Sequence, residues 1–405
     1  MKSRRESSRR ARVEAGDALE VTIERILPGG FGLAHAAGQT VFVALAAAGD
    51  RVRVRVAETR GKLAFASIEE VLEPSPSRVE PPCPYFGRCG GCDFQQLTYQ
   101  AQLDAKVEII RDCLRRIAQL APPDEIPITP SPDPWRYRSR ARWQYDRDGE
   151  RLGYFERGTH RVCDVAVCPV VVPELQQLLE DLRVEVPVYM LPEEAREFEA
   201  VAGDDAEVSL SPPVWTDAPR ELARTIGGEH YRFDADCFFQ INHALLSTLV
   251  REGLQDAAGD SALDLYSGVG LFTLPLARRF ERVTAVEGNA TATAFARRNL
   301  AEASLTNARV ETAPVGEWLA RARGRLGQVN FVLLDPPRAG ADTETVLSLL
   351  ALRPDRISYV SCDPATLARD LRAFTSDGYA VETVRAFDMF PQTHHVETVV
   401  HLRRV

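Results

Sequence analysis

A cysteine and a glutamate late in the chain have the residue types that covalent chemistry on a pyrimidine ring requires. Cys362 ends an apolar run in YVSCDP, and Glu397 lies in PQTHHVETVVHL. Pyrimidine C5 is too weak a nucleophile to take a methyl group directly, but a thiolate that adds to C6 makes C5 enolate-like. A carboxylate must then remove the C5 proton before the thiolate can leave. Cys362 is therefore a candidate nucleophile and Glu397 a candidate base.

A glycine turn upstream of this pair suggests the methyl donor. The predicted strand 262–266 runs into a turn that contains Gly268 and Gly270, and the next predicted strand ends at Glu287. This is the plan of a nucleotide-binding α/β sheet, but the third glycine of the dinucleotide fingerprint is replaced by Thr273. Without a pyrophosphate to hold, the turn fits S-adenosylmethionine, with Glu287 accepting hydrogen bonds from the ribose hydroxyls.

The region 226–405 alternates apolar strand segments with helical ones, which predicts a doubly wound parallel sheet. Its predicted strands 331–335 and 357–361 lead to Asp335 and Cys362. Because parallel strands present their carboxyl ends at one edge, that edge is the expected ligand site. We predict an α/β fold with a C-terminal Rossmann-like methyltransferase domain.

Other chemistries use parts of the same pattern. Asp335-Pro-Pro resembles the (Asp/Asn)-Pro-Pro-aromatic motif of amino-group methyltransferases, although Arg338 replaces the aromatic residue. Cytosine-5 RNA enzymes usually have a second cysteine after this Asp-Pro, where the chain has Pro337. A non-catalytic RNA-binding module is a third alternative, although the candidate pocket groups are all present.

The N-terminal part predicts a basic tail at 1–14 and an OB-like β-barrel at 15–72, followed by a Pro-rich linker. Arg51, Arg53 and Arg55 share one strand face in the barrel. Such a stripe is usually the solvated side of a strand, but it could also follow a phosphate backbone.

The segment 83–225 is expected to form a central domain that contains a C-x5-C-x2-C motif and a helix at 98–119. Disulfides are not expected in a cytosolic protein, and four thiolates could hold zinc or an iron-sulfur cluster. Arginines occupy every second position further along, at Arg136, Arg138, Arg140 and Arg142, so that on a strand they would share one face. Their positive charges would repel one another there, which predicts that the face contacts RNA or, alternatively, that it is the solvated side of an edge strand.

Composition restricts the class of protein. The chain has 405 residues and a net charge of −9, although its first residues are strongly basic. No apolar run is long enough to cross a bilayer and no secretory signal is visible, so we expect a cytoplasmic protein. An acidic chain must meet any nucleic acid with local basic patches.

The segments DLYSGVGLFTL, LLDPPRAG, YVSCDPATLARDL and FPQTHHVETVV resemble the RNA uracil-5 methyltransferase family. The resemblance covers nearly the whole chain and implies that Cys362 is the nucleophile and Glu397 the base. It implies that a pocket for S-adenosylmethionine and uracil is lined by Gln240, Tyr266, Glu287 and Asp335. The barrel resembles a TRAM domain, an RNA-binding module.

The same resemblance implies a four-iron four-sulfur (4Fe-4S) cluster held by Cys83, Cys89, Cys92 and Cys168, and the proline after Cys168 favours it over Cys163. In two places the chain departs from the family: Leu271 stands where some members have a polar residue, and no clear adenine partner lies in 311–314. We therefore expect a monomeric enzyme that makes 5-methyluridine in a flipped-out base of structured RNA. The expected substrate is 23S ribosomal RNA, with transfer RNA as the alternative.

Overall fold

The structure is a computed structural model that describes residues 13–185, 196–215, 220–322 and 324–405. These residues form two compact units. The first comprises the described residues up to Gly87, together with Cys92–Ile109 and Gln392–His394, and the second comprises Arg88–Gly91, Ile110–Pro391 and His395–Val405. Within the described ranges, no helix is long and apolar enough to cross a membrane.

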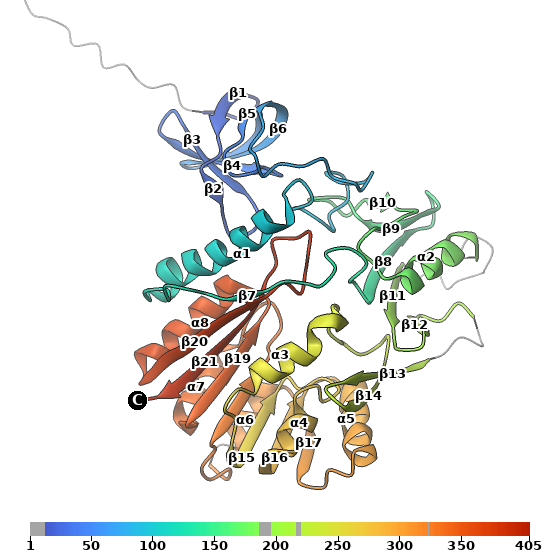
Figure 1. The fold of residues 1–405 in the computed structure, drawn as a ribbon, viewed down its shortest axis with the longest axis vertical. Coiled ribbons are helices and arrows are strands. Elements are labelled where there is room, and N and C mark those ends of the chain that lie inside the picture. Colours follow the sequence, from blue (N-terminus) through green and yellow to red (C-terminus); the bar gives the residue numbers. More distant parts are fainter. Residues whose placement is uncertain (1–12, 186–195, 216–219, 323) are drawn as a thin grey trace, which may run out of the picture. The chain divides into compact units, whose positions relative to one another are not determined.

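The first unit begins with a β-rich fold (Figure 1), as the sequence predicts. Its strands alternate buried and exposed side chains, so that Val52, Val54 and Val56 of one strand all lie in the core. They pair in the order β1-β5-β6-β4-β3-β2. The strands are β1 (Ala18–Thr22), β2 (Arg25–Ile26), β3 (Gly32–Ala36), β4 (Gln39–Ala44), β5 (Arg51–Arg60) and β6 (Leu63–Glu73).

The arginine side chains on one face of β5 form ion pairs with neighbouring glutamates. Arg51 pairs with Glu73 and Arg53 with Glu70, while Glu20 contacts both guanidinium groups. In the same way, Arg55 pairs with Glu69 at 2.7 Å. This face therefore resembles the solvated side of a strand rather than a surface of uncompensated positive charge.

Helix α1 (Tyr99–Cys113) lies where a helix is predicted and continues as a π-helical turn, Leu114–Ala118. The helical segment ends where Gln119 adopts a left-handed φ of 59°. Cys113 is 2% exposed, so it is a core residue, as its position in the helix suggests.

The middle of the chain belongs to the second unit. It forms an antiparallel sheet in the order β10-β9-β8-β11-β12, a separate hairpin and a helix. The elements are β8 (Arg140–Asp146), β9 (Arg151–Phe155), β10 (Val162–Asp164), α2 (Pro173–Glu185), β11 (Glu197–Ala202), β12 (Val208–Ser211), β13 (Glu221–Ile226) and β14 (Glu229–Asp234).

The C-terminal sheet is the α/β fold that the sequence predicts, and Figure 1 shows helices on both of its faces. Its order is β17-β16-β15-β18-β19-β21-β20-β7. The first five strands in this order are parallel, whereas β21 is antiparallel to both of its neighbours. The chain order reverses between β15 and β18, and ligands bind beside the carboxyl ends of the strands at such a point.

These strands are β7 (Ile128–Thr129), β15 (Gly259–Leu265), β16 (Phe280–Glu287), β17 (Ala308–Thr312), β18 (Phe331–Leu334), β19 (Arg356–Ser361), β20 (Tyr379–Phe387) and β21 (Glu397–Arg404). The helices are α3 (Leu246–Gly253), α4 (Thr273–Ala277), α5 (Ala290–Glu302), α6 (Val315–Ala322), α7 (Thr343–Leu352) and α8 (Pro364–Ser376), with a 3₁₀ turn at His243–Leu245.

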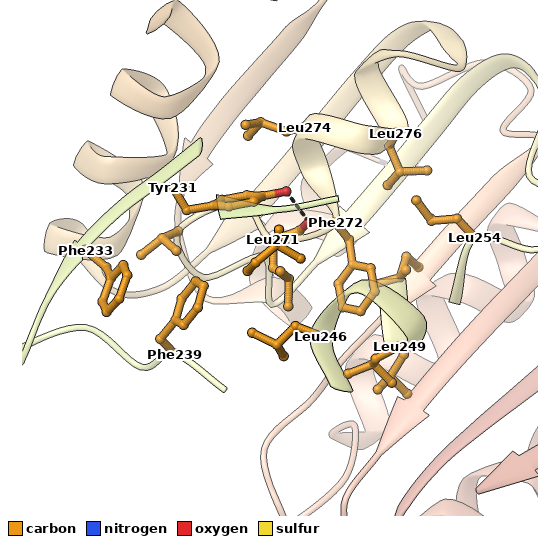
Figure 2. Packing of buried hydrophobic residues seen from close by; sticks show 14 of the residues in the cluster. Tyr231, Phe233, Phe239, Leu246, Leu249, Leu254, Leu271, Phe272, Leu274 and Leu276 are labelled. Atoms are coloured by element: carbon orange, nitrogen blue, oxygen red, sulfur yellow. Dashed lines mark hydrogen bonds between the residues drawn. The ribbon is translucent and has the colours of Figure 1, made fainter. Parts of the chain in front are cut away.

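A hydrophobic cluster supports the glycine turn of this sheet (Figure 2). Leu271 is 7% exposed and packs in this cluster, and its carbonyl accepts a hydrogen bond of 3.0 Å from the Tyr231 hydroxyl. Nearby, the rings of Phe233 and Phe239 stack at 4.4 Å. At the position where some members of the resembled family have a polar residue, this chain therefore has a core side chain.

Candidate active site

The pairing of β19 with β21 brings Cys362 and Glu397 together. Ser361 is the partner of Thr398 in this antiparallel ladder. In an antiparallel pair, the residue after one partner lies opposite the residue before the other. Cys362, which follows the end of β19, therefore lies opposite Glu397, the first residue of β21. Both side chains line one cavity.

That cavity has a volume of about 590 Å³ and lies within the second unit. This volume is in the usual range for small-molecule sites. The cavity contains most of the residues proposed from the sequence, but Gly270 is not among its lining residues. It is lined by Arg138, Phe238, Gln240, Ile241, Tyr266, Gly268, Glu287, Asn289, Ala292, Asp335, Pro336, Pro337, Arg338, Cys362, Phe390 and Glu397.

The glycine turn is held in shape by Glu287. Its carboxylate accepts hydrogen bonds from the backbone N–H groups of Gly268 at 3.0 Å and Asn289 at 2.7 Å. Asn289 itself caps helix α5, so Glu287 is not a helix cap. A carboxylate has about four acceptor sites. Glu287 therefore retains capacity for hydroxyl donors of a ligand.

Gly268, which lines the cavity, leaves space for a ligand because it has no side chain. Its φ is 54°, and a methyl group at this position would meet only the Phe238 carbonyl oxygen, at 4.0 Å. Any side chain here would therefore project into the cavity. In addition, Thr273, which stands at the third position of the dinucleotide fingerprint, donates a hydrogen bond to the buried carboxylate of Asp264. The turn thus fits a ligand without a pyrophosphate.

Two acidic side chains, Asp264 and Asp335, influence each other's charge near the cavity, and Asp335 lines it. Burial raises the pKa of Asp264 to about 7, although the bond from Thr273 opposes the shift. Burial also raises the pKa of Asp335, and the charge of Asp264 adds to this effect. Nε2 of Gln240 donates to Asp335 at 3.4 Å, which lowers that pKa in part. Glu287, Asp335 and Glu397 line the cavity, and carboxyl groups at a pocket suit a cationic ligand, whose charge would favour their ionised forms.

The two candidate reactive groups both prefer their neutral forms. Burial raises the pKa of the Cys362 thiol to about 12, with a further contribution from the charge of Glu397. Burial also raises the pKa of Glu397 well above its usual value, and the charge of Asp335 acts in the same direction. The guanidinium of Arg338 opposes both shifts. Arg338 therefore favours the ionised forms that the proposed chemistry needs.

Alkylation of Cys362 by iodoacetamide is expected to speed up about tenfold per pH unit between pH 7 and pH 10. The thiolate is the reactive form, and its fraction rises tenfold per unit while the pH remains below the pKa of about 12. Peptide mass spectrometry of the labelled protein gives the rate. A plateau below pH 9 would contradict the raised pKa, and Arg338→Gln should slow labelling at any one pH.

The four arginines named from the sequence do not form one strand face. Strand β8 begins at Arg140, which pairs with Glu199 at 3.1 Å and donates to two backbone carbonyls. Arg142 also pairs with Glu199. The predicted repulsion is therefore relieved by strand β11. Of the other two, Arg136 has a 68% exposed side chain and Arg138 lines the cavity.

The candidate cluster ligands belong to different units. Cys83 and Cys92 are in the first, and Cys89 and Cys168 are in the second. Across all described residues, no group of three or more His, Cys, Asp or Glu side chains is placed to hold a metal ion. The donor chemistry does fit thiolates, because Sγ of Cys89 accepts a bond from Gly91 N and Sγ of Cys168 accepts one from the Tyr154 hydroxyl.

Cys163 differs from the half-buried Cys168. Its side chain is buried at 1% exposure, and its Sγ accepts a hydrogen bond from Nε of Arg88 at 3.2 Å. The described structure includes all eight cysteines and contains no disulfide.

Sequence reasoning missed Phe238, Asn289 and Phe390 in the cavity, and it gave Arg338 no role there. Phe238 is 62% exposed, which is unusual for so large an apolar side chain. Its position two residues before Gln240 was a usable signal, since both lie in one short segment. Phe390 begins the segment FPQTHHVETVV, whose family resemblance was a usable signal for it.

Comparison with protein families gives two matches. Residues 223–405 match the family described as tRNA (Uracil-5-)-methyltransferase. Residues 12–68 match the TRAM domain.

Individual relatives cover nearly the whole chain. A Thiobacillus denitrificans protein named 23S rRNA (uracil(1939)-C(5))-methyltransferase RlmD is 34% identical, over 93% of this chain and 97% of its own. An uncharacterized RNA methyltransferase of Streptomyces avermitilis is 36% identical, over 96% and 98%. The crystal structure of Pyrococcus abyssi tRNA (uracil-54, C5)-methyltransferase with S-adenosyl-L-homocysteine matches with a TM-score of 0.73 and 26% identity, over 95% of this chain and 100% of that one.

Proposed function

Because the chain belongs to the RNA (uracil-5-)-methyltransferase family, we propose that it methylates C5 of a uridine in 23S ribosomal RNA. The observation that carries the proposal is the strand register that sets Cys362 opposite Glu397 at one cavity. A nucleophile and a base at a single pocket are what C5 methylation needs and what amino-group methylation does not.

The proposed reaction assigns one role to each group. The Cys362 thiolate attacks C6 of the flipped uracil, and the electron pair of the C5–C6 bond becomes available at C5. S-adenosylmethionine, when bound, supplies the methyl group that C5 takes. Glu397 then removes the C5 proton, the C5–C6 double bond re-forms, and the Cys362 sulfur leaves. Arg338 favours the ionised forms of both groups throughout.

The carboxyl groups that line the cavity and the glycine turn support a site for S-adenosylmethionine. Gly268 leaves space for the ligand, and Glu287 has remaining acceptor capacity for the ribose hydroxyls. Tyr266, Gln240 and Asp335 line the rest of the same cavity. The Pyrococcus abyssi methyltransferase was crystallised in complex with S-adenosyl-L-homocysteine, the demethylated form of this donor.

We propose that arginines of the 136–142 segment contact the RNA. Arg138 lines the cavity, and the side chains of Arg136 and Arg142 are 68% and 63% exposed, although Arg136 pairs with Asp133 and Arg142 with Glu199. Arg140, which is 13% exposed and also pairs with Glu199, is the least accessible of the four. Contact with phosphate groups would make RNA affinity fall with salt.

Two relatives favour ribosomal RNA as the substrate, since those from Thiobacillus denitrificans and Pseudomonas syringae are both named for 23S rRNA. Transfer RNA is the alternative because the Pyrococcus abyssi enzyme is named for tRNA. The test is methylation of purified 23S ribosomal RNA and transfer RNA with labelled S-adenosylmethionine, followed by nucleoside mass spectrometry. Labelled 5-methyluridine from ribosomal RNA alone supports the proposal. An amino-methylated base would overturn it and assign the chemistry to Asp335.

We also propose that Cys83, Cys89, Cys92 and Cys168 hold a 4Fe-4S cluster with a structural role. The support is the C-x5-C-x2-C spacing, the half-burial of all four cysteines and the hydrogen bonds to the sulfur atoms of Cys89 and Cys168. Cys163 is buried and bonded to Arg88, so it is not assigned as a ligand.

Cys168→Ser is expected to lose most of the iron and sulfide of the anaerobically purified protein, because serine is a poor ligand for this cluster. Cys163→Ser, a matched change in the same segment, should retain them. Iron, sulfide and visible absorbance are the measurements. Equal loss in both variants would contradict the assignment of the fourth ligand, and zinc without sulfide in the wild type would contradict the cluster itself.

A further inference from the structure

The loop that carries Arg338 follows strand β18 and lies within the second unit. It comprises residues 335–341, and its residues Asp335 and Arg338 both line the cavity. The backbone N–H of Asp335 donates to the Leu265 carbonyl at 3.3 Å, which joins the start of the loop to β15. Two prolines follow in succession, and they have no N–H groups to donate. The rest of the loop therefore depends on other contacts for its position.

Helix α8 supplies such contacts to the loop backbone. The Thr366 hydroxyl donates a hydrogen bond to the Arg338 carbonyl at 3.2 Å. Nη2 of Arg369 donates to the carbonyl oxygens of Ala339 and Ala341 at 3.1 and 3.0 Å. Three carbonyl groups of the loop are thus bonded to side chains of one helix.

Asp370 joins the same loop to the strand before Cys362. Its carboxylate accepts hydrogen bonds from the Ala341 N–H at 3.0 Å, from the Tyr359 hydroxyl at 2.7 Å and from Nε of Arg369 at 2.8 Å. Asp370 is 3% exposed and Tyr359 is 0% exposed, so loss of a partner would leave a buried polar group unsatisfied. Tyr359 lies in β19, three residues before Cys362.

Gly340 shows how closely the loop packs against these three residues of α8. Its φ is 77°, and a methyl group at this position would lie 2.6 Å from Nη2 of Arg369 and 2.8 Å from Oδ2 of Asp370. It would also lie 3.1 Å from Cβ of Thr366. We call the three residues the α8 cluster: Thr366, Arg369 and Asp370.

The Arg338 side chain has no comparable support of its own. Within the described part of the chain, its guanidinium forms no hydrogen bond or ion pair. Its position therefore depends on where the loop places the backbone. The charge of Arg338 lowers the pKa of the Cys362 thiol, whereas three nearby carboxylates raise it. Those carboxylates are Glu397, Asp335 and Asp363.

We propose that the residues of the α8 cluster are positioning residues that hold the Arg338 guanidinium in the cavity with the two reactive groups, an inference that rests on the proposed function. The cluster is not part of the cavity lining, so it acts through the loop and not on the substrate. Release of the loop would let the positive charge move away from Cys362 and Glu397 without removing it. Both groups would then be ionised less often at a given pH.

The test measures alkylation of Cys362 by iodoacetamide in full-length Arg369→Ala at one fixed pH, with peptide mass spectrometry. We expect labelling to be about 3- to 10-fold slower than in the wild type, because a displaced opposite charge loses part of its effect on the thiol. Arg338→Gln should slow labelling at least as much. The double variant should label no more slowly than Arg338→Gln alone, since Arg369 acts through that guanidinium.

A pH profile separates this effect from damage to the fold. The labelling rate of Arg369→Ala should keep the wild-type slope against pH and lie below it at every pH. Local unfolding would expose the thiol and speed up labelling, which is the opposite result. Cys113, at 2% exposure, should remain unlabelled in each variant.

Thr366 provides a second, conservative pair of variants. Thr366→Val removes the hydroxyl that donates to the Arg338 carbonyl and should slow labelling of Cys362, whereas Thr366→Ser keeps the hydroxyl and should label as the wild type. Arg372→Ala is the matched control for Arg369→Ala. Arg372 is an exposed arginine of the same helix that has no bond to the loop in the described structure, so labelling should not change.

Methylation of 23S ribosomal RNA gives a readout on the reaction itself. The kcat of Arg369→Ala should fall about 10-fold, while KM for RNA stays within about twofold because the cluster lies outside the cavity lining.

The labelling comparison needs no RNA, so its result is independent of the substrate. Labelling of Arg369→Ala at or above the wild-type rate would overturn the positioning role. Slowing that adds to the effect of Arg338→Gln would overturn it as well. If the wild type makes no 5-methyluridine in any RNA, the proposed function fails, which is a different result from an unchanged labelling rate.

Discussion

Cys362→Ala is expected to abolish 5-methyluridine formation, with a loss of roughly 10⁴-fold or more in kcat, because uracil C5 is not activated without the thiolate. The variant should still bind RNA, since the cavity gains only the space of one sulfur atom. Single-turnover assays with labelled S-adenosylmethionine measure the loss. No covalent protein–RNA band should form, whatever the incubation time.

The matched control is Cys113→Ala. Cys113 is also a buried thiol whose pKa is raised to about 12 by burial, but it belongs to helix α1 and does not line the cavity. It should retain activity. Substantial 5-methyluridine formation by Cys362→Ala would exclude the covalent mechanism and return Asp335 to consideration as the group that holds the substrate.

Glu397→Gln is expected to stop the reaction after methyl transfer, and turnover should fall by roughly 10² to 10⁴-fold, the usual contribution of a general base. The amide has nearly the shape of the carboxylate but cannot accept the C5 proton. Up to one methyl group per enzyme should therefore be transferred and remain in a covalent protein–RNA complex. Denaturing gels and scintillation counting detect this complex.

Glu382→Gln is the control for this change. Glu382 lies in strand β20 and forms ion pairs with Arg356 and Arg403 away from the cavity lining. Partly exposed pairs of this kind contribute only about 0–1 kcal/mol, so activity should persist. Complete turnover by Glu397→Gln without a trapped complex would show that another group removes the proton.

The sequence predicted the strand ends of the C-terminal sheet because each is a short apolar run that stops at a polar residue. The strands 262–266 and 357–361 appear as β15 and β19, within a few residues of their expected limits. The partner of Cys362 was harder to predict. Nothing local to Glu397 indicates that its strand runs antiparallel to β19. The expectation that it lies beside Cys362 rested on the need for a carboxylate in the chemistry and on the family resemblance.

Other features depended on neighbours that are distant in sequence. Leu271 follows the glycine turn directly, but its side chain packs in the core. The ion pairs of Arg140 and Arg142 with Glu199 join strands β8 and β11, which are far apart in the sequence, so the sequence alone did not indicate them. The contact of Gln102 with Gln392 spans 290 residues, and such pairing cannot be inferred from one sequence.

Strand β21 is inserted between β19 and β20, and it is the last of the three in chain order. The antiparallel ladder beside β19 therefore needs residues that are synthesised after both β19 and β20. If Cys362 and Glu397 act as proposed, a nascent chain that has not yet reached β21 contains the nucleophile without the base. Such a chain should not complete a methylation cycle on RNA.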